Sequence, residues 1–122
     1  GFVARGFSGD VDQLKEIIKE AILYDGYALV DILQPCIVWN KVNTFQWYKD
    51  RVKPLDEKHD PTDWQKAYEK ALTWGDEIPT GILYKVPTES YTKKFGFLDG
   101  HTPLVDRELN PMDAQKLMEK MK

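Results

Sequence analysis

The sequence contains a single cysteine and only two histidines, and this scarcity excludes several kinds of site. One thiol cannot build an internal disulfide framework, which favours a reducing, cytoplasmic setting. It also excludes a zinc site made from this chain's cysteines alone, because such a site needs several thiolates. No apolar run approaches the roughly 18 residues that a membrane-spanning helix requires, and no signal-peptide pattern opens the chain. We therefore expect no membrane partner.

An excess of charge of one sign is also missing. The chain has 17 Lys and Arg against 20 Asp and Glu, a net charge of −3, so no basic face for nucleic acid is predicted. Its 122 residues suffice for one domain with a core and are too few for two. The first residue is not methionine, and a strand-like segment follows at once. We expect residues 1–122 to be a single, truncated domain; the alternative is a complete small protein behind one extra glycine.

The central stretch of the sequence runs from Ala28 to Cys36. Residues 28–33 are apolar except for Asp31, which is typical of a parallel strand covered on both faces. Pro35 cannot donate to a sheet and ends the strand, so Cys36 follows its carboxyl end, the edge where open α/β sheets bind cofactors. A buried carboxylate needs partners, and Asp31 is expected either to pair with a lysine or to cap a neighbouring helix.

Helical signals flank this strand. Asp10 and Gln13 resemble a capping box, an apolar stripe runs from Val11 to Ile22, and Gly26 supplies a C-terminal cap. With a first strand near residues 2–5, this predicts a βαβ unit. Two further helices are predicted, one from Thr44 to Pro54 and one from an Asp60 N-cap to Gly75 with Trp64 in the core. A last helix is predicted from Asn110 onward, and its buried face is made of Ala114, Leu117, Met118 and Met121.

A third strand is predicted at residues 80–86, and residues 88–109 read as an irregular arm whose aromatic residues Tyr91, Phe95 and Phe97 anchor to a neighbouring surface. The fold class is therefore α/β: a short, mostly parallel sheet of about three strands with flanking helices. Such a sheet has two open edges, so we expect further strands from elsewhere and self-association of the isolated chain.

Three interpretations of Cys36 remain open at this point: a small buried hydrophobe, a catalytic thiol paired with a histidine, or one ligand of a metal cluster whose other ligands lie elsewhere. His59 and His101 lie in polar loops without a carboxylate that would orient them as a base. The segment His59-Asp60-Pro61-Thr62-Asp63 is explained by helix capping without a metal. Three functions of the chain are therefore considered. It is part of a redox enzyme, a thiol enzyme built on Cys36, or a stand-alone interaction module without catalytic activity.

Several segments together resemble a known family. They are Phe2-Val3-Ala4-Arg5-Gly6-Phe7, Asp31-Ile32-Leu33-Gln34-Pro35-Cys36 with Trp39-Asn40, Tyr48-Lys49 with Arg51, His59-Asp60-Pro61, and Ile78-Pro79-Thr80-Gly81-Ile82-Leu83-Tyr84. Over residues 2–91 the chain resembles the carboxyl-terminal portion of the beta subunit of 2-oxoacid:ferredoxin oxidoreductases, the 2-oxoglutarate type in particular. Within these segments Leu33-Gln34-Pro35-Cys36 followed by Trp39-Asn40 is the most specific part.

The resemblance implies an enzyme that decarboxylates a 2-oxoacid oxidatively on thiamine diphosphate and magnesium, passes electrons through a [4Fe-4S] cluster to ferredoxin, and releases an acyl-coenzyme A. The implied partners are an alpha subunit, ferredoxin, coenzyme A and the 2-oxoacid. Cys36 matches the fourth cluster ligand, and the three others, like the residues that hold thiamine diphosphate, match none of these 122 residues. The resemblance therefore implies one metal ligand here, Cys36, no catalytic or cofactor-binding residue, and a segment that alone binds no cofactor and is inactive.

Overall fold

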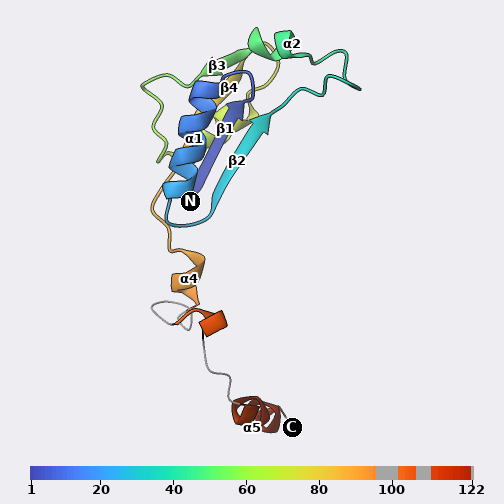
Figure 1. Ribbon diagram of the computed structural model, residues 1–122. Helices are drawn as coiled ribbons and strands as arrows, with labels where there is room; N and C mark the ends of the chain where they lie inside the picture. The colour runs from blue at the N-terminus through green and yellow to red at the C-terminus, as the bar shows by residue number, and fades with distance from the viewer. Residues whose placement is uncertain (96–101, 107–110, 122) are drawn as a thin grey trace. The chain divides into compact units, whose positions relative to one another are not determined.

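The computed structural model describes residues 1–95, 102–106 and 111–121. The chain forms two compact units, Gly1–Tyr91 and Thr92–Lys122 (Figure 1). The first unit contains a mixed sheet with helices against it. Its elements are, in order, β1 (Phe2–Phe7), α1 (Val11–Leu23), β2 (Ala28–Leu33), α2 (Phe45–Lys49), β3 (Val52–Pro54), α3 (Trp64–Leu72) and β4 (Ile78–Lys85).

The sheet has four strands in the order β2-β1-β4-β3. β1 and β2 are parallel, with Phe2 opposite Ala28 and Phe7 opposite Leu33, which confirms the expected βαβ unit. β4 runs antiparallel to β1, and β3 runs parallel to β4. The α/β class with a short, mostly parallel sheet is therefore confirmed. The expected count of about three strands is too low, because β3 is only three residues long and has no side-chain alternation that a sequence pattern would reveal.

One face of the sheet is covered by α1. The side chain of Asp10 accepts a hydrogen bond from the backbone N–H of Gln13 at 3.1 Å, so the predicted N-cap is confirmed. Ile17 then packs on Phe2 and Ala4, which are fully buried. The helix ends at Leu23, before the expected Gly26 cap, because Tyr24 is already extended and its hydroxyl donates to the Val86 carbonyl at 2.6 Å.

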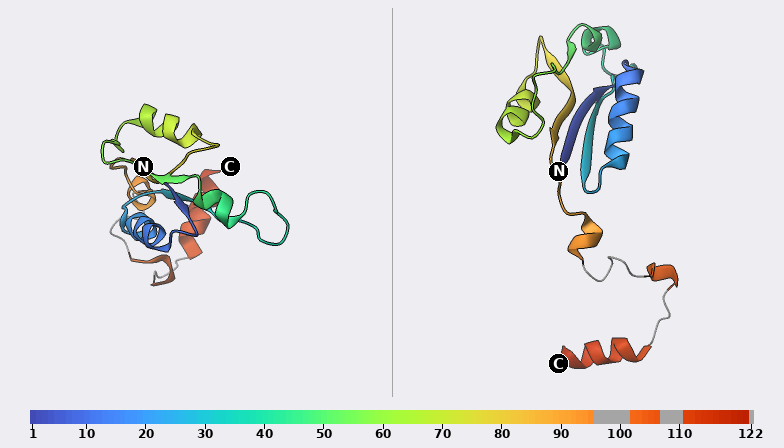
Figure 2. Two further views of the ribbon diagram at one scale, coloured as in Figure 1. Left: turned by 90° about the horizontal axis from the view of Figure 1, so that it is seen from above. Right: turned by 90° about the vertical axis from the view of Figure 1, so that its left-hand side faces the viewer.

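The opposite face carries the second core cluster and α3, and the right-hand view of Figure 2 shows α1 and α3 on opposite sides of the strands. Phe7, Leu33 and Ile78 are buried there and pack against Trp47 and Tyr48 of α2. The expected helix start at Thr44 is confirmed, because its hydroxyl accepts from the Trp47 N–H at 3.3 Å. The helix ends at Lys49 rather than near Pro54, and the chain pairs with β4 instead.

The predicted start of α3 is three residues too early. Asp60 does not cap the helix: its carboxylate accepts from the backbone N–H and the hydroxyl of Thr62, at 2.9 and 2.7 Å, and holds a turn. Asp63 is the N-cap, since it accepts from the Lys66 N–H at 3.1 Å. The pKa of each aspartate is lowered, because these hydrogen bonds stabilise the carboxylate. The largest contribution comes from the Thr62 hydroxyl at Asp60 and from the Lys66 backbone N–H at Asp63.

Two expectations of burial are wrong in this structure. β2 is not covered on both faces: it lies at the edge of the sheet, and Leu29 and Ile32 are 46% and 42% exposed. Trp64 is not in the core either. It is 63% exposed and stacks on Tyr68 beside a hollow between α3 and the sheet, and Ala67 is the residue of α3 that is buried. Both positions are apolar by pattern, but no described element covers them.

The second unit contains short helical pieces. Within the segment expected to be an irregular arm lie α4 (Tyr91–Lys94), which begins at the last residue of the first unit, and the 3-10 turn η1 (Leu104–Asp106). The rest of that arm at residues 96–101 and 107–109, with Phe97, and the expected cap Asn110 fall outside the described residues. In α5 (Pro111–Lys120) the expected buried face is wrong, because Leu117 and Met118 are exposed. None of the helices in the described ranges is both long and apolar enough to cross a bilayer.

Candidate metal centre

Cys36 lies three residues beyond the carboxyl end of β2, at the predicted position. There the ends of β1 and β2 lie side by side, because Ser8 donates its backbone N–H to the Leu33 carbonyl at 3.0 Å. The thiol is free and exposed. The alternative of a small buried hydrophobe therefore does not describe this cysteine, and its sulfur is accessible to a ligand or a metal.

The backbone after Cys36 folds back over the sulfur. The N–H of Trp39 lies 3.4 Å from Sγ, and the Asn40 N–H donates to the Cys36 carbonyl at 3.3 Å. The N–H of Trp39, followed by those of Val38 and Asn40, lowers the pKa of the Cys36 thiol, because these dipoles stabilise the thiolate. A thiolate is the form that binds metal. The sequence does not reveal these contacts, because they depend on the turn that the backbone adopts.

The loop that follows is fixed by its own hydrogen bonds. Asn40 Oδ1 accepts from the backbone N–H groups of Val42 and Asn43, both at 2.9 Å. Lys41 Nζ donates to the Ile37 carbonyl at 2.8 Å. Between this loop and the start of α2 lies a hollow of about 370 Å³, lined by Pro35, Ile37, Asn40, Lys41, Thr44, Phe45 and Gln46. The loop therefore presents Cys36 from a defined turn.

The chain has one thiol, whereas an iron–sulfur cluster requires several thiolates. Among the described ranges, no group of three or more His, Cys, Asp or Glu side chains is placed to hold a metal ion. An exposed thiol with a lowered pKa fits one ligand position of an iron–sulfur cluster, which is held by several thiolates. The remaining ligands would have to come from outside the described residues.

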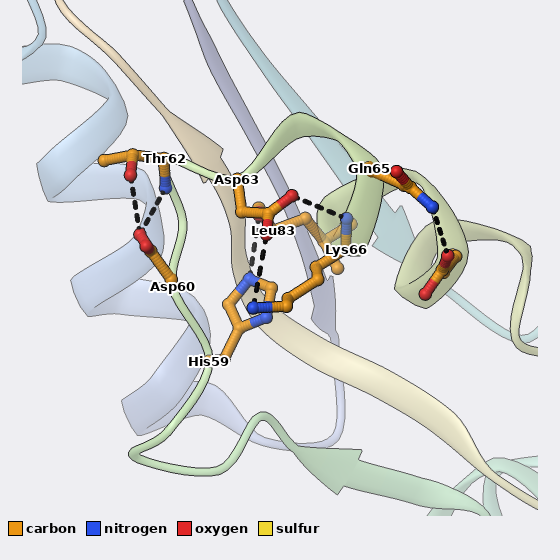
Figure 3. A network of polar contacts seen from close by, with 8 residues as sticks. His59, Asp60, Thr62, Asp63, Gln65, Lys66 and Leu83 are labelled. Atoms are coloured by element: carbon orange, nitrogen blue, oxygen red, sulfur yellow. Dashed lines mark hydrogen bonds and ion pairs between the residues drawn. The ribbon is translucent and has the colours of Figure 1, made fainter.

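His59 lies at the other end of the sheet from Cys36. Its Nε2 is 2.8 Å from the carbonyl oxygen of Leu83, beside the aspartate turn that precedes α3 (Figure 3). Leu83 lies next to Tyr84, which pairs with Val3 near the start of β1, whereas Cys36 follows the end of β2. Val3 is opposite Leu29, and the four residue steps from Leu29 to the end of β2 at Leu33 span about 13 Å, with Cys36 beyond that end. The structure therefore does not bring His59 to the thiol, and His101 lies outside the described residues.

Asp31 has a partner that the sequence did not suggest. Arg5 Nε donates to its carboxylate at 2.8 Å, instead of a lysine or a helix N-terminus. The same guanidinium donates to the Ala71 carbonyl at 3.2 Å and lies over the Trp74 ring. Arg5 therefore ties β1, β2 and the end of α3 together. Arg5 and Asp31 meet because they are opposite each other in the parallel register of β1 and β2, which the sequence alone does not give.

The lowered pKa of Cys36 gives a direct prediction. Because the thiolate is the reacting form, alkylation of the folded chain by iodoacetamide should reach its half-maximal rate at a lower pH than alkylation of the same chain in denaturant, where a free thiol has a pKa of about 8.5. Trp39→Pro removes the first N–H donor and should raise the midpoint, whereas Trp39→Ala keeps the donor and should not. Equal midpoints for folded and denatured chain would contradict the assignment.

Comparison with known proteins shows the relationship of this chain. Residues 36–100 match the family described as the C-terminal part of the pyruvate ferredoxin oxidoreductase beta subunit. The chain is 44% identical over 98 residues to the 2-oxoacid:ferredoxin oxidoreductase subunit beta of a Sulfolobus species, covering 69% of this chain and 31% of that protein. It is 41% identical over 97 residues to subunit beta of the 2-oxoacid:ferredoxin oxidoreductase 1 of Aeropyrum pernix, covering 70% of this chain and 30% of that protein.

A solved structure supports the similarity to beta subunits of 2-oxoacid:ferredoxin oxidoreductases. The 2-oxoglutarate:ferredoxin oxidoreductase from Magnetococcus marinus with 2-oxoglutarate, coenzyme A and succinyl-CoA bound matches with a TM-score of 0.73 and 33% identity, covering 99% of this chain and 40% of that chain. The chain thus spans about a third of the length of the curated relatives it matches. By its sequence and its fold, the chain belongs to the carboxyl-terminal region of the beta subunit of 2-oxoacid:ferredoxin oxidoreductases.

Proposed function

We propose that the chain supplies one thiolate ligand, Cys36, to a [4Fe-4S] cluster in the beta subunit of a 2-oxoacid:ferredoxin oxidoreductase. The observation that carries the proposal is the exposed thiol of Cys36, whose pKa is lowered by the N–H groups of the turn that follows it. Donors of this kind hold a thiolate and tune the potential of an iron–sulfur centre. When bound, the cluster supplies one-electron transfer.

The role of this chain's residues is to hold that sulfur in place. Pro35 fixes the backbone before it, and the N–H groups of Val38, Trp39 and Asn40 surround it. Asn40 Oδ1 then accepts from the N–H groups of Val42 and Asn43, which fixes the backbone of the loop that follows the sulfur. The Trp39 indole is 88% exposed, so within this chain the backbone of Trp39 acts on the sulfur and its ring does not cover it.

The complete enzyme in this proposal carries out the oxidative decarboxylation of a 2-oxoacid, 2-oxoglutarate or one similar to pyruvate, to an acyl-coenzyme A. Thiamine diphosphate and magnesium are bound by other parts of the beta subunit, and the partners are coenzyme A, ferredoxin and the alpha subunit. The chain itself is inactive alone. Support for this assignment comes from the family to which residues 36–100 belong and from the placement of Cys36.

The test uses the complete beta subunit with its alpha subunit, purified without oxygen. We expect about four iron and four sulfide per cluster by chemical analysis, and we expect Cys36 to resist alkylation until the iron is removed with a chelator. Loss of the cluster should expose Cys36 to iodoacetamide. A complete enzyme that contains no iron, or one in which Cys36 reacts equally fast before and after chelation, would overturn the proposal. Alkylation that stops turnover without any iron present would instead favour a thiol enzyme.

A further inference from the structure

We propose that Phe7 is a positioning residue for the cluster ligand: its ring holds both ends of the loop that carries Cys36. This inference rests on the proposed function and adds to it the part of the fold that sets the place of the sulfur. It is drawn from the contacts of the Phe7 ring, from the turn that follows Phe7 and from the course of the loop. In the rest of this subsection, residues 34–44, between β2 and α2, are called the cysteine loop.

The cysteine loop leaves the sheet and returns to it at the Phe7 side chain. It begins after Leu33, the last residue of β2, and ends before Phe45, the first residue of α2. Phe7 is opposite Leu33 in the parallel register, and both are buried in one core cluster. At the other end of the loop, the ring centroid of Phe7 lies 5.7 Å from that of Phe45 and 5.9 Å from that of Tyr48, on which it stacks. One side chain therefore contacts the residues at both ends of the loop.

Between its ends the cysteine loop extends away from the sheet, as the left-hand view of Figure 2 shows. The side chains of Ile37 and Trp39 are exposed. The hydrogen bonds of Cys36, Asn40 and Lys41 join these residues to others of the same loop. These bonds give the loop its shape, and its place relative to the sheet is set where it begins and ends. The contacts of Phe7 are therefore the ones that locate the sulfur.

The turn after β1 fixes the ring of Phe7. The Asp10 N–H donates to the Phe7 carbonyl at 2.9 Å, and the Ser8 N–H donates to the Leu33 carbonyl at 3.0 Å. A Cβ added at Gly9 would lie 2.6 Å from Cζ of the Phe7 ring and closer still to Cε1, so the ring occupies the space that a side chain at residue 9 would need. Because Phe7 is only 3% exposed, its ring is enclosed by packed neighbours and has little room to move aside. Glycine at position 9 is therefore part of what holds the ring.

A displaced Phe7 ring would displace the sulfur. Cys36 follows Leu33 by three residues, and Pro35 restricts the backbone between them. A metal ligand has to be held within about 0.5 Å of its working position by residues that are themselves locked by packing. The potential of an iron–sulfur centre also depends on the hydrogen bonds to its sulfurs. Phe7 is a buried residue of this kind, and it acts on the centre through Cys36.

The first test measures amide hydrogen exchange by mass spectrometry in the complete enzyme after removal of iron, so that the protein alone holds the loop. Phe7→Leu removes part of the ring at the end of β1, and Phe2→Leu makes the same change at its beginning, where the side chain packs against α1. We expect Phe7→Leu to speed exchange in residues 34–48 about tenfold or more with little change in α1, and Phe2→Leu to do the reverse. Equal effects of the two variants on residues 34–48 would overturn the proposal, because Phe7 would then act only through general stability.

A second pair of variants tests the same link without altering Phe7. Gly9→Ala crowds the Phe7 ring, and Gly6→Ala is its control, because a Cβ there would lie 2.7 Å from Cδ1 of Leu14 in α1 instead. In the enzyme with its iron, Gly9→Ala and Phe7→Leu should shift the electron paramagnetic resonance g values and the midpoint potential of the cluster, and Gly6→Ala and Phe2→Leu should leave both near those of the wild type. Unchanged values in Phe7→Leu would overturn the positioning role. A wild-type enzyme without any cluster would instead refute the proposed function, and the exchange comparison would still decide whether Phe7 holds the loop.

Discussion

Replacing Cys36 by serine in the complete enzyme is expected to abolish ferredoxin reduction, lowering its rate by at least about 100-fold, while thiamine diphosphate still binds. Serine has nearly the same size and keeps the turn, but its hydroxyl is not ionised at neutral pH and is a poor ligand for iron. The Trp39 N–H, which lies 3.4 Å from the sulfur, would then face a neutral oxygen. The measurements are the rate with 2-oxoacid and coenzyme A, the iron content, the electron paramagnetic resonance signal of the reduced cluster, and thiamine diphosphate binding.

A matched control separates loss of the ligand from a general disturbance of this end of the sheet. Val11 is 68% exposed at the first position of α1 and is not among the residues whose N–H groups act on the Cys36 thiol, so Val11→Ser should keep both the rate and the cluster signal near those of the wild type. An undiminished rate of ferredoxin reduction in Cys36→Ser would show that the thiol is not an essential ligand. Loss of thiamine diphosphate binding together with the cluster would show that the substitution acts through the fold.

The parts of the fold that the sequence predicted well are those set by neighbours in the chain. The cap at Asp10 and the helix start at Thr44 are local features, because in each case the side chain accepts from an N–H three residues further along the chain. β2 was placed at residues 28–33 because Pro35 cannot pair in a sheet, and this fixed the position of Cys36 as well. The carboxyl end of a strand is a local feature, so the candidate site was found from the sequence.

Burial was predicted less well, because periodicity shows which face of an element is apolar and does not show whether another element covers it. Trp64 and Met118 lie on apolar stripes and are exposed in this structure. β2 is apolar along its length and is an edge strand. The prediction of Asp60 as the cap of α3 was wrong, because Asp63 three residues later also precedes a suitable helix start and only the backbone conformation decides between them.

Contacts between distant segments were not predictable from spacing. Arg5 meets Asp31 only because β1 and β2 are parallel and in this register, and His59 meets Leu83 only because the loop before α3 returns to β4. Neither pair has a local signature. The second result argues against His59 as the base of a thiol enzyme centred on Cys36, because its ring is held on the Leu83 carbonyl toward the other end of the sheet.

The largest expected effect on stability comes from Phe2. Its side chain is fully buried against Ala4 and Ile17, and its ring centroid lies 5.6 Å from that of Tyr24. Phe2→Ala removes a large apolar side chain from a closed core, which costs about 3–5 kcal/mol of the free energy of unfolding. Such a loss is comparable to the whole stability of a small domain. Denaturant titration followed by circular dichroism, at a low concentration of the chain to limit self-association, measures it.

Trp64→Ala is the matched control, because it removes an even larger aromatic side chain, one that the sequence pattern assigns to the core. With Trp64 63% exposed and stacked on Tyr68 at 5.4 Å, the cost should stay below about 1.5 kcal/mol, the upper value for an aromatic pair. Equal losses for the two substitutions would mean that α3 is buried in the folded chain in solution. A large difference would show that the sheet and α1 form the stable core that holds the end of β2, and with it Cys36, in place.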